Sequence, residues 1–387
     1  MQYTVSRHQV HHHAAALLQA HLRLRDFGRT CPARTLLSVV LAACCRLTSL
    51  AGACARLLLA PSRETLRQAL LANLPEMAAL ERCLNRALAA DLPRALRRRE
   101  QRLAIDLTLV PYHGLPYREA AEVYRSLARR GTSHFHAYAT LYVAYRGQRF
   151  TVALTWVQRG EALEAVLRRL LRRAARLGVR VRLLLLDRGF FSVGVIRYLQ
   201  AARYPFLMPV VLRGRRLDDP RGPSGTRAFL SWPRSGWGRY TLTAPGGRTA
   251  TAGVCVRCRN WAGQWGRQGR QRLVYAFWGL LPPGTEWVRQ TYRLRFGIET
   301  SYRQLHQGRA RTCSRNPAVR LFLVGVALLL RNVWVWLHYA VLSTPRRGGR
   351  RLNPERLSLK DLLLMLLHVA EEELGTIDMI ACERPLE

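Results

Sequence analysis

The pattern of apolar and polar positions changes near residue 100, and the change predicts two kinds of structure. Residues 1–99 have the pattern of helices. Apolar stretches of strand length follow at Arg102–Val110, Phe135–Tyr145 and Phe150–Val157, the last two separated by a short polar turn. We therefore expect a helical N-terminal region followed by a region that contains a β-sheet.

Helical and strand patterns alternate beyond these three strands. A helix is predicted at Glu161–Leu177, a strand at Val181–Asp187, a helix at Ser192–Ala202 and a strand at Pro205–Leu212. Further helices are predicted at Glu286–Gln307, Ala318–Leu342 and Ser358–Glu373. The order β, β, β, α, β, α, β favours an α/β fold in which a mixed sheet is flanked by helices.

These changes of pattern divide the chain into five predicted regions. They are a helical N-terminal region at 1–99, the first part of an α/β core at 100–212, a β-rich insertion at 213–285, the second part of the core at 286–345 and a C-terminal helical tail at 346–387. The insertion is recognised by its many Gly, Pro, Trp and Arg residues and its short alternating runs.

The apolar run Leu321–Leu342 is long enough to raise the question of a membrane span. Arg331, Asn332 and His338 interrupt it, and polar residues of this kind are costly in a bilayer. We expect a buried helix and no membrane association.

A possible helix–turn–helix lies within the N-terminal region. Ala51–Leu59 and Arg63–Leu71 have the proportions of its two helices, and Ser62 after a proline is a good N-cap for the second. Arg63 and Arg67 would lie on the exposed face of that helix, where a DNA-reading helix carries its donors. An ordinary helical hairpin has the same pattern, so both interpretations stay open.

The net charge of the chain indicates which kind of molecule it binds. The chain of 387 residues has 62 Lys and Arg against 24 Asp and Glu, a formal net charge of +38. A surface this positive repels itself unless it meets a polyanion, which makes nucleic acid the first expected partner and a membrane surface the second. The nine cysteines are scattered and odd in number, as expected of reduced thiols in a cytosolic protein.

Two acids occupy unusual positions in strongly apolar strands. Asp106 lies in the middle of the first predicted strand, and Asp187 ends the strand that begins at Val181. Carboxylates at strand ends gather at the edge of an open α/β sheet, where ligands bind. Two carboxylates side by side repel each other unless a cation lies between them, and Mg²⁺ prefers oxygen ligands. Pairing of each acid with an arginine is the alternative.

The predicted helix Glu286–Gln307 carries a third acid. At about 100° per residue, one stripe of roughly 80° contains an acid among cations and a phenol. Its members are Tyr292, Arg295, Glu299, Arg303 and His306. Leu294, Ile298 and Leu305 fall on the opposite side, which we expect to be the side that packs. Arg295 and Glu299 could also form a simple pair one turn apart.

These motifs together resemble a known family. Tyr292-x₂-Arg295-x₃-Glu299 resembles the YREK signature of bacterial insertion-sequence DDE transposases. Asp106-Leu-Thr and Asp187-Arg-Gly-Phe are similar to the two aspartate motifs of that family, and the insertion at 213–285 precedes the glutamate as it does there. The resemblance covers roughly 100–340. His306 stands where the family has a lysine, and a histidine binds phosphate only in the right protonation state.

The resemblance implies an RNase H-like core with Asp106, Asp187 and Glu299 as catalytic residues. It implies that these acids hold two Mg²⁺ ions, for which Mn²⁺ may substitute, and that the protein cleaves DNA and transfers strands at insertion-sequence ends. The partners would be double-stranded transposon ends and target DNA, bound by a homodimer in the cytoplasm at the nucleoid. The expected DNA-binding residues are Tyr292, Arg295, Arg303, His306, Arg63 and Arg67.

Two other functions share most of these features. A metal-dependent nuclease with the same core would cut DNA without joining it. A catalytically inactive, DNA-binding descendant would keep the fold and the charge; His306 supports it, and one of the three acids paired tightly to an arginine, with no room for a cation, would favour it. These are the alternatives that a structure and a DNA assay have to separate.

Overall fold

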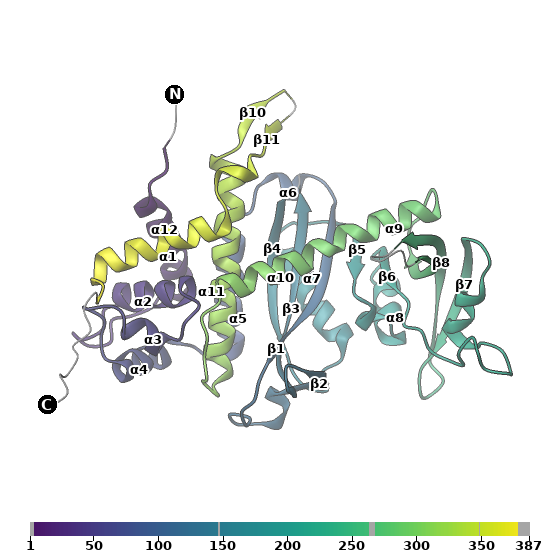
Figure 1. The fold of residues 1–387 in the computed structure, drawn as a ribbon, viewed down its shortest axis with the longest axis horizontal. Helices are drawn as coiled ribbons and strands as arrows, with labels where there is room; N and C mark the ends of the chain where they lie inside the picture. Colours follow the sequence, from purple (N-terminus) through teal and green to yellow (C-terminus); the bar gives the residue numbers. More distant parts are fainter. Residues whose placement is uncertain (1–3, 146–147, 263–267, 348, 378–387) are drawn as a thin grey trace, which may run out of the picture. The chain divides into compact units, whose positions relative to one another are not determined.

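A computed structural model describes residues 4–145, 148–262, 268–347 and 349–377 (Figure 1). The chain forms two compact units, each made of segments that are distant in sequence. Unit 1 contains Met1–Leu92, Leu109–Ala137 and Ser301–Glu387, and unit 2 contains Pro93–Thr108 and Tyr138–Thr300.

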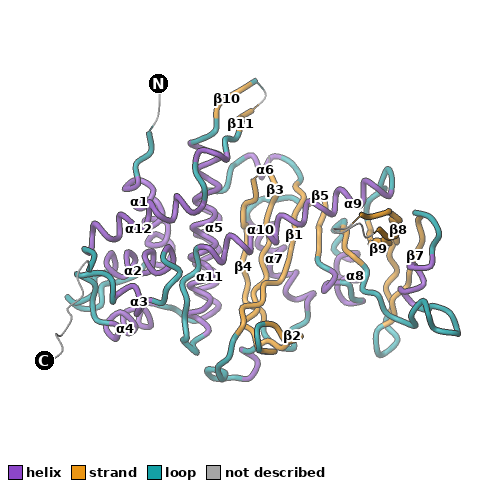
Figure 2. The backbone as a smooth tube through the Cα atoms, viewed as in Figure 1, coloured by secondary structure: helices purple, strands orange, loops and turns teal. Residues whose placement is uncertain are grey.

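Unit 1 is mainly helical, as the pattern of its first residues predicts (Figure 2). Its helices are α1 (Arg7–Leu22), α2 (Ala33–Cys45), α3 (Leu50–Cys54), α4 (Arg63–Asn73), α5 (Met77–Ala90), α11 (Pro317–Trp336) and α12 (Leu359–Leu374). Most side chains of α2 and α11 are buried, α2 packs against α12, and α11 packs against α5. These two helices therefore supply the core of unit 1.

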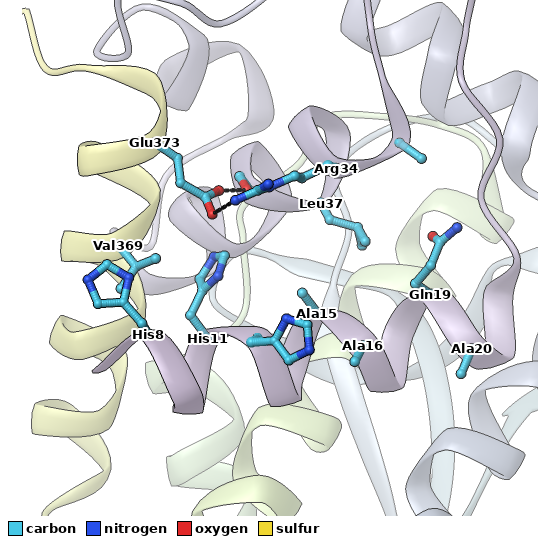
Figure 3. A pocket seen from close by; sticks show the side chains of 13 residues that line it. His8, His11, Ala15, Ala16, Gln19, Ala20, Arg34, Leu37, Val369 and Glu373 are labelled. Carbon is cyan, nitrogen blue, oxygen red and sulfur yellow. Dashed lines mark hydrogen bonds and ion pairs between the residues drawn. The ribbon is translucent and has the colours of Figure 1, made fainter. Parts of the chain in front are cut away.

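Polar contacts join α1, α2 and α12 beside a cavity of about 760 Å³ (Figure 3). Glu373 of α12 accepts hydrogen bonds from Arg34 at 2.7 Å and from the Ser38 hydroxyl at 2.6 Å, both on α2. His11 of α1 is 5% exposed at the same cavity, and its Nε2 has no hydrogen-bond partner among the described residues.

The long apolar helix is buried, as predicted. Pro317–Val341, which is α11 and the π-helical turn after it, is long and apolar enough to cross a membrane, and 94% of its most apolar stretch is buried inside the molecule. Two of its polar side chains have partners: Arg331 Nε donates to Gln304 Oε1 at 3.0 Å, and Asn332 Nδ2 donates to the Leu88 carbonyl at 3.1 Å. These hydrogen bonds explain how a buried helix tolerates the two polar side chains.

The expected helix–turn–helix is only partly present. The second helix, α4, begins after Ser62, whose side chain caps it by accepting from the Thr65 N–H at 3.1 Å. The first helix was predicted at Ala51–Leu59, but α3 ends at Cys54. The backbone of Leu58 and Leu59 instead donates to the end of α12, at 3.1 and 2.7 Å. Long-range backbone hydrogen bonds therefore replace the last turns of the predicted helix.

A nine-stranded mixed sheet confirms the predicted α/β fold. Its order is β2-β3-β1-β5-β6-β9-β8-β7, with β4 paired to β3. The strands are β1 (Gln101–Pro111), β2 (Tyr124–Arg129), β3 (Thr132–Tyr145), β4 (Gln148–Val157), β5 (Val181–Leu186), β6 (Phe206–Pro209), β7 (Gly236–Thr243), β8 (Thr249–Ala262) and β9 (Gln268–Trp278). The polar strand β2 was not predicted. A separate hairpin, β10 (Thr344–Arg346) and β11 (Gly349–Arg351), precedes α12.

The predicted β-rich insertion consists of β7, β8 and β9, and these strands extend the same sheet. β9 pairs antiparallel with β6, from Phe206 opposite Trp278 to Pro209 opposite Tyr275. β8 and β7 follow, each antiparallel to its neighbour. The predicted β content is confirmed, while the five region boundaries remain predictions.

The helices of unit 2 cover its strands. They are α6 (Ala95–Arg98), α7 (Leu163–Arg176), α8 (Val193–Ala201) and α9 (Thr285–Arg293). α7 packs against β4 and against α8, and both α8 and α9 contact β8. α10 (Gly297–Gln307) begins in unit 2 and ends in unit 1.

Candidate active site

Two neighbouring parallel strands bring Asp106 and Asp187 together. β1 and β5 pair in parallel, with Ile105 opposite Leu186, so the next residue on each strand is an aspartate. Both strands are held by buried apolar side chains on the preceding positions. Asp106 is 7% exposed, whereas the Asp187 side chain, just past its strand, is 39% exposed. The hydrogen-bond ladder therefore sets the spacing of the two acids.

One guanidinium lies between the two carboxylates. Arg295 Nη2 donates to Asp106 Oδ2 at 2.7 Å and is 3.2 Å from Asp187 Oδ1. Arg295 is 5% exposed, and the Tyr142 hydroxyl donates to its carbonyl at 3.0 Å. Its Nε is buried without a hydrogen-bond partner among the described residues. The site therefore holds a buried cation whose Nε has no partner in the part of the chain that the structure describes.

Burial dominates the electrostatics of Asp106. The pKa of its carboxyl is raised from 3.8 to about 6, chiefly by desolvation and to a smaller extent by the Asp187 carboxylate, while the Arg295 charge lowers it. The Leu107 N–H donates to Asp106 Oδ1 at 2.8 Å and favours the charged form. Even with an arginine in contact, the pair of acids lacks positive charge.

Tyr292 is part of the same cluster. It is 4% exposed, its hydroxyl donates to the Leu186 carbonyl at 3.3 Å, and its ring centroid lies 5.2 Å from that of Tyr275. Burial raises the pKa of its phenol, so it remains a neutral donor. The structure thus places Tyr292 against the end of β5, beside Asp187.

The predicted helix Glu286–Gln307 is interrupted, so its polar and apolar residues do not form the two continuous stripes that were expected. A 3₁₀ turn, Leu294–Phe296, separates α9 from α10. Because a 3₁₀ turn advances about 120° per residue instead of 100°, positions after it are rotated from an ideal α-helix. Leu294, expected to pack, is 42% exposed, whereas the polar residues Tyr292 and Arg295 are buried.

Glu299 lies on α10, four residues after Arg295. The side chain of Glu299 lies outside the part of the molecule that the structure describes. Among the side chains that the structure describes, no group of three His, Cys, Asp or Glu residues is arranged to hold a metal ion. Asp106 and Asp187 are therefore the described oxygen donors of the candidate site.

The remaining predicted residues belong to unit 1 and are described apart from this cluster. Arg303 is exposed on α10. Partial desolvation, together with the positive Arg309 and Arg130, lowers the pKa of His306, so its imidazole is neutral near pH 7. Arg63 and Arg67 are exposed on α4, where Arg67 Nε donates to Glu64 at 2.8 Å.

Two residues near the site were not predicted. Tyr142 of β3 holds the backbone of Arg295, as described above. Arg149 of β4 approaches Gly297 so closely that a Cβ on Gly297 would lie 1.9 Å from its Nε. The glycine between Arg295 and Glu299 is the sequence signal for this close approach.

Comparison with known families gives one match. A family model described as Transposase DDE domain matches residues 97–332, which include both aspartates, Arg295 and Glu299. Among curated proteins, none matches the chain. The mixed sheet flanked by helices agrees with the RNase H-like fold expected of such transposases. The match covers more than half of the chain, and we conclude that this protein belongs to the DDE transposase family.

Proposed function

We propose that this transposase cleaves DNA at insertion-sequence ends and transfers the resulting strands, using divalent metal ions. The observation that carries the proposal is the placement of Asp106, within β1, beside Asp187, which directly follows the parallel strand β5. The chain between them contains the strands β2, β3, β4 and β5 and the helix α7, so their proximity is a property of the fold and not of local sequence.

The two aspartates fit a hard divalent cation. Both offer carboxylate oxygens, the donors that Mg²⁺ prefers. The pKa of Asp106, about 6 despite the contact with Arg295, indicates that further positive charge would stabilise the ionised pair. Asp106, Asp187 and Glu299 would hold two Mg²⁺ or Mn²⁺ ions. When bound, such ions activate a nucleophile and stabilise the leaving oxygen of an in-line displacement at phosphorus.

Arg295 has two tasks in this proposal. Through Nη2 it neutralises the aspartates and keeps them together. Its Nε is a buried donor without a partner among the described side chains, and a phosphate oxygen of DNA would satisfy it. Tyr292 positions this region by bonding the Leu186 carbonyl.

The basic surface supports DNA as the substrate. Arg63 and Arg67 on α4 are exposed, and the whole chain has a formal charge of +38. We propose that α4 contacts the transposon ends, that Arg303 and His306 contact DNA near α10, and that a homodimer joins two ends at the bacterial nucleoid in the cytoplasm without membrane contact. His306 is neutral when free, and a nearby phosphate would raise its pKa and allow it to donate.

A second candidate function has its own observation. The contact of Arg295 with both aspartates is what a catalytically inactive, DNA-binding descendant would show. In that protein the guanidinium would permanently replace the metal ions, and cleavage would be absent at every metal concentration.

The test uses linear DNA that carries the element's own ends, with Mg²⁺ or Mn²⁺. Wild type is expected to cleave the ends, and Asp187→Asn is expected to lose cleavage while it still binds DNA. Asp218→Asn is the matched control, because Asp218 is an exposed carboxylate of unit 2. Absence of cleavage in wild type would favour the inactive descendant, and cleavage without joining of pre-cut ends would identify a nuclease.

A further inference from the structure

A second cavity of about 1030 Å³ lies in unit 1 and contains none of the proposed catalytic residues. Its walls come from α3, the start of α4, the loop at Tyr117 and the segment 311–316 that leads into α11. The Arg311 N–H donates to the Thr48 carbonyl at 2.9 Å, and Arg315 Nη2 donates to the Pro116 carbonyl at 2.7 Å. We call it the α4 groove, and these bonds hold its walls together.

The α4 groove is strongly positive. Among the described residues that line it are four arginines and one acid, Glu64. The arginines are Arg63, Arg67, Arg311 and Arg315. Arg67 pairs with Glu64, but within the described part of the chain no carboxylate pairs with the other three. Uncompensated guanidinium groups in a concave site favour a ligand with several negative charges.

The groove also has an apolar side. Leu50, Leu70, Leu71 and Val319 line it, and Tyr117, 44% exposed, stands at its wall. Phosphate groups alone do not require apolar or aromatic side chains. A ligand that combines phosphates with flat apolar rings uses both kinds of lining.

We propose that the α4 groove binds an unpaired segment of a DNA strand, with phosphates on the arginines and bases against Tyr117 and the leucines. A duplex keeps its bases stacked inside and presents only phosphates and groove edges to a protein. The volume is at the upper end of the roughly 300–1,000 Å³ that hold organic ligands, which suits one or two nucleotides. The inference rests on the proposed DNA substrate but not on the aspartates or on metal ions.

The first test measures binding by fluorescence anisotropy, without metal, for a single-stranded oligonucleotide and for its duplex. The full-length variant Arg311→Ala/Arg315→Ala, which leaves the arginines of α4 in place, should bind the single strand about tenfold more weakly. The slope of its salt dependence should fall by roughly 1.4, because each phosphate left without its arginine accounts for about 0.7. Tyr117→Ala should weaken single-strand binding alone, and Arg82→Ala, an exposed arginine of α5, should change neither. Equal losses for single strand and duplex, or no loss, would overturn the proposal.

The second test needs no substitution at the groove. Cys313 is exposed and lines it, whereas the partly exposed Cys83 lies on α5. A single-stranded oligonucleotide should slow the alkylation of Cys313 at least threefold and leave Cys83 unchanged, as measured by peptide mass spectrometry. Equal protection by polyglutamate of matched charge would show a general polyanion site and refute the inference. Because Asp187→Asn should behave as wild type here, failure of the groove and failure of catalysis are distinguishable.

Discussion

Replacing Asp106 with asparagine tests which force dominates in the candidate active site. The folded protein holds the pKa of Asp106 at about 6 against an ordinary 3.8, chiefly because the carboxyl is buried. A carboxyl with a raised folded pKa lowers the free energy of unfolding as pH rises from the ordinary to the folded value. At about 1.36 kcal/mol per pH unit, the ionised Asp106 costs about 3 kcal/mol above pH 6 relative to its protonated form.

Asp106→Asn removes this titration. The difference in stability, variant minus wild type, should therefore increase by about 3 kcal/mol between pH 3.8 and pH 7. For a unit of 150–250 residues this is roughly a 6–12 °C change in the difference of melting temperatures. Comparing the variants at two pH values cancels whatever the asparagine gains or loses in hydrogen bonding.

The assay is thermal unfolding without divalent ions at pH 4 and pH 7, followed by near-UV circular dichroism. Asp218→Asn, an exposed change of the same chemistry, is the control for the loss of one carboxylate. A variant that becomes relatively less stable as pH rises would refute the reasoning, because it would show that attraction to Arg295 exceeds the cost of burial.

Three further predictions concern other parts of the chain. Arg295→Gln should lower the free energy of unfolding at pH 7 by about 3 kcal/mol, because two carboxylates lose their cation. Mg²⁺ should raise the melting temperature of this variant more than that of wild type. An equal rise in both melting temperatures would contradict the prediction. Burial lowers the pKa of His136 to about 3, so this residue alone should lower the free energy of unfolding by about 2 kcal/mol between pH 6.5 and pH 5, as the unfolded chain takes up a proton, against the opposite contribution of Asp106. His136→Phe should remove that loss in urea titrations, and an unchanged acid branch would exclude His136 as its source. Gly325→Ala on α11 should destabilise unit 1 by about 1–3 kcal/mol, since the new Cβ would lie 2.6 Å from Leu84. Chemical denaturation measures this loss of stability. An unchanged stability would mean that α5 can shift.

The strands and their acids could be predicted because the information is local. An apolar run that ends in an acid identifies β5 and Asp187, and a central acid in β1 identifies Asp106. Their adjacency follows once the two strands are parallel neighbours. The polar edge strand β2 escaped prediction because its exposed positions give no apolar alternation.

The arrangement around Arg295 could not be derived in the same way. An ideal helical wheel assigns Leu294 to the packing side. No local sequence pattern predicts the 3₁₀ turn, which changes the direction of the side chains along the helix. The contact of one guanidinium with both aspartates joins three distant segments. Likewise, the helix expected through Leu59 ends early because its backbone bonds the end of α12, which no local pattern encodes.

The parallel ladder between β1 and β5 also allows the two aspartates to be placed on separate fragments. Arg159 and Gly160 are exposed between β4 and α7, so a cut there would leave Asp106 on one fragment and Asp187 on the other. Backbone pairing from Arg102 opposite Leu183 to Ile105 opposite Leu186 would restore their spacing when the fragments recombine. Two fragments that each lack one aspartate could then complement each other, so that mixing them restores the complete site.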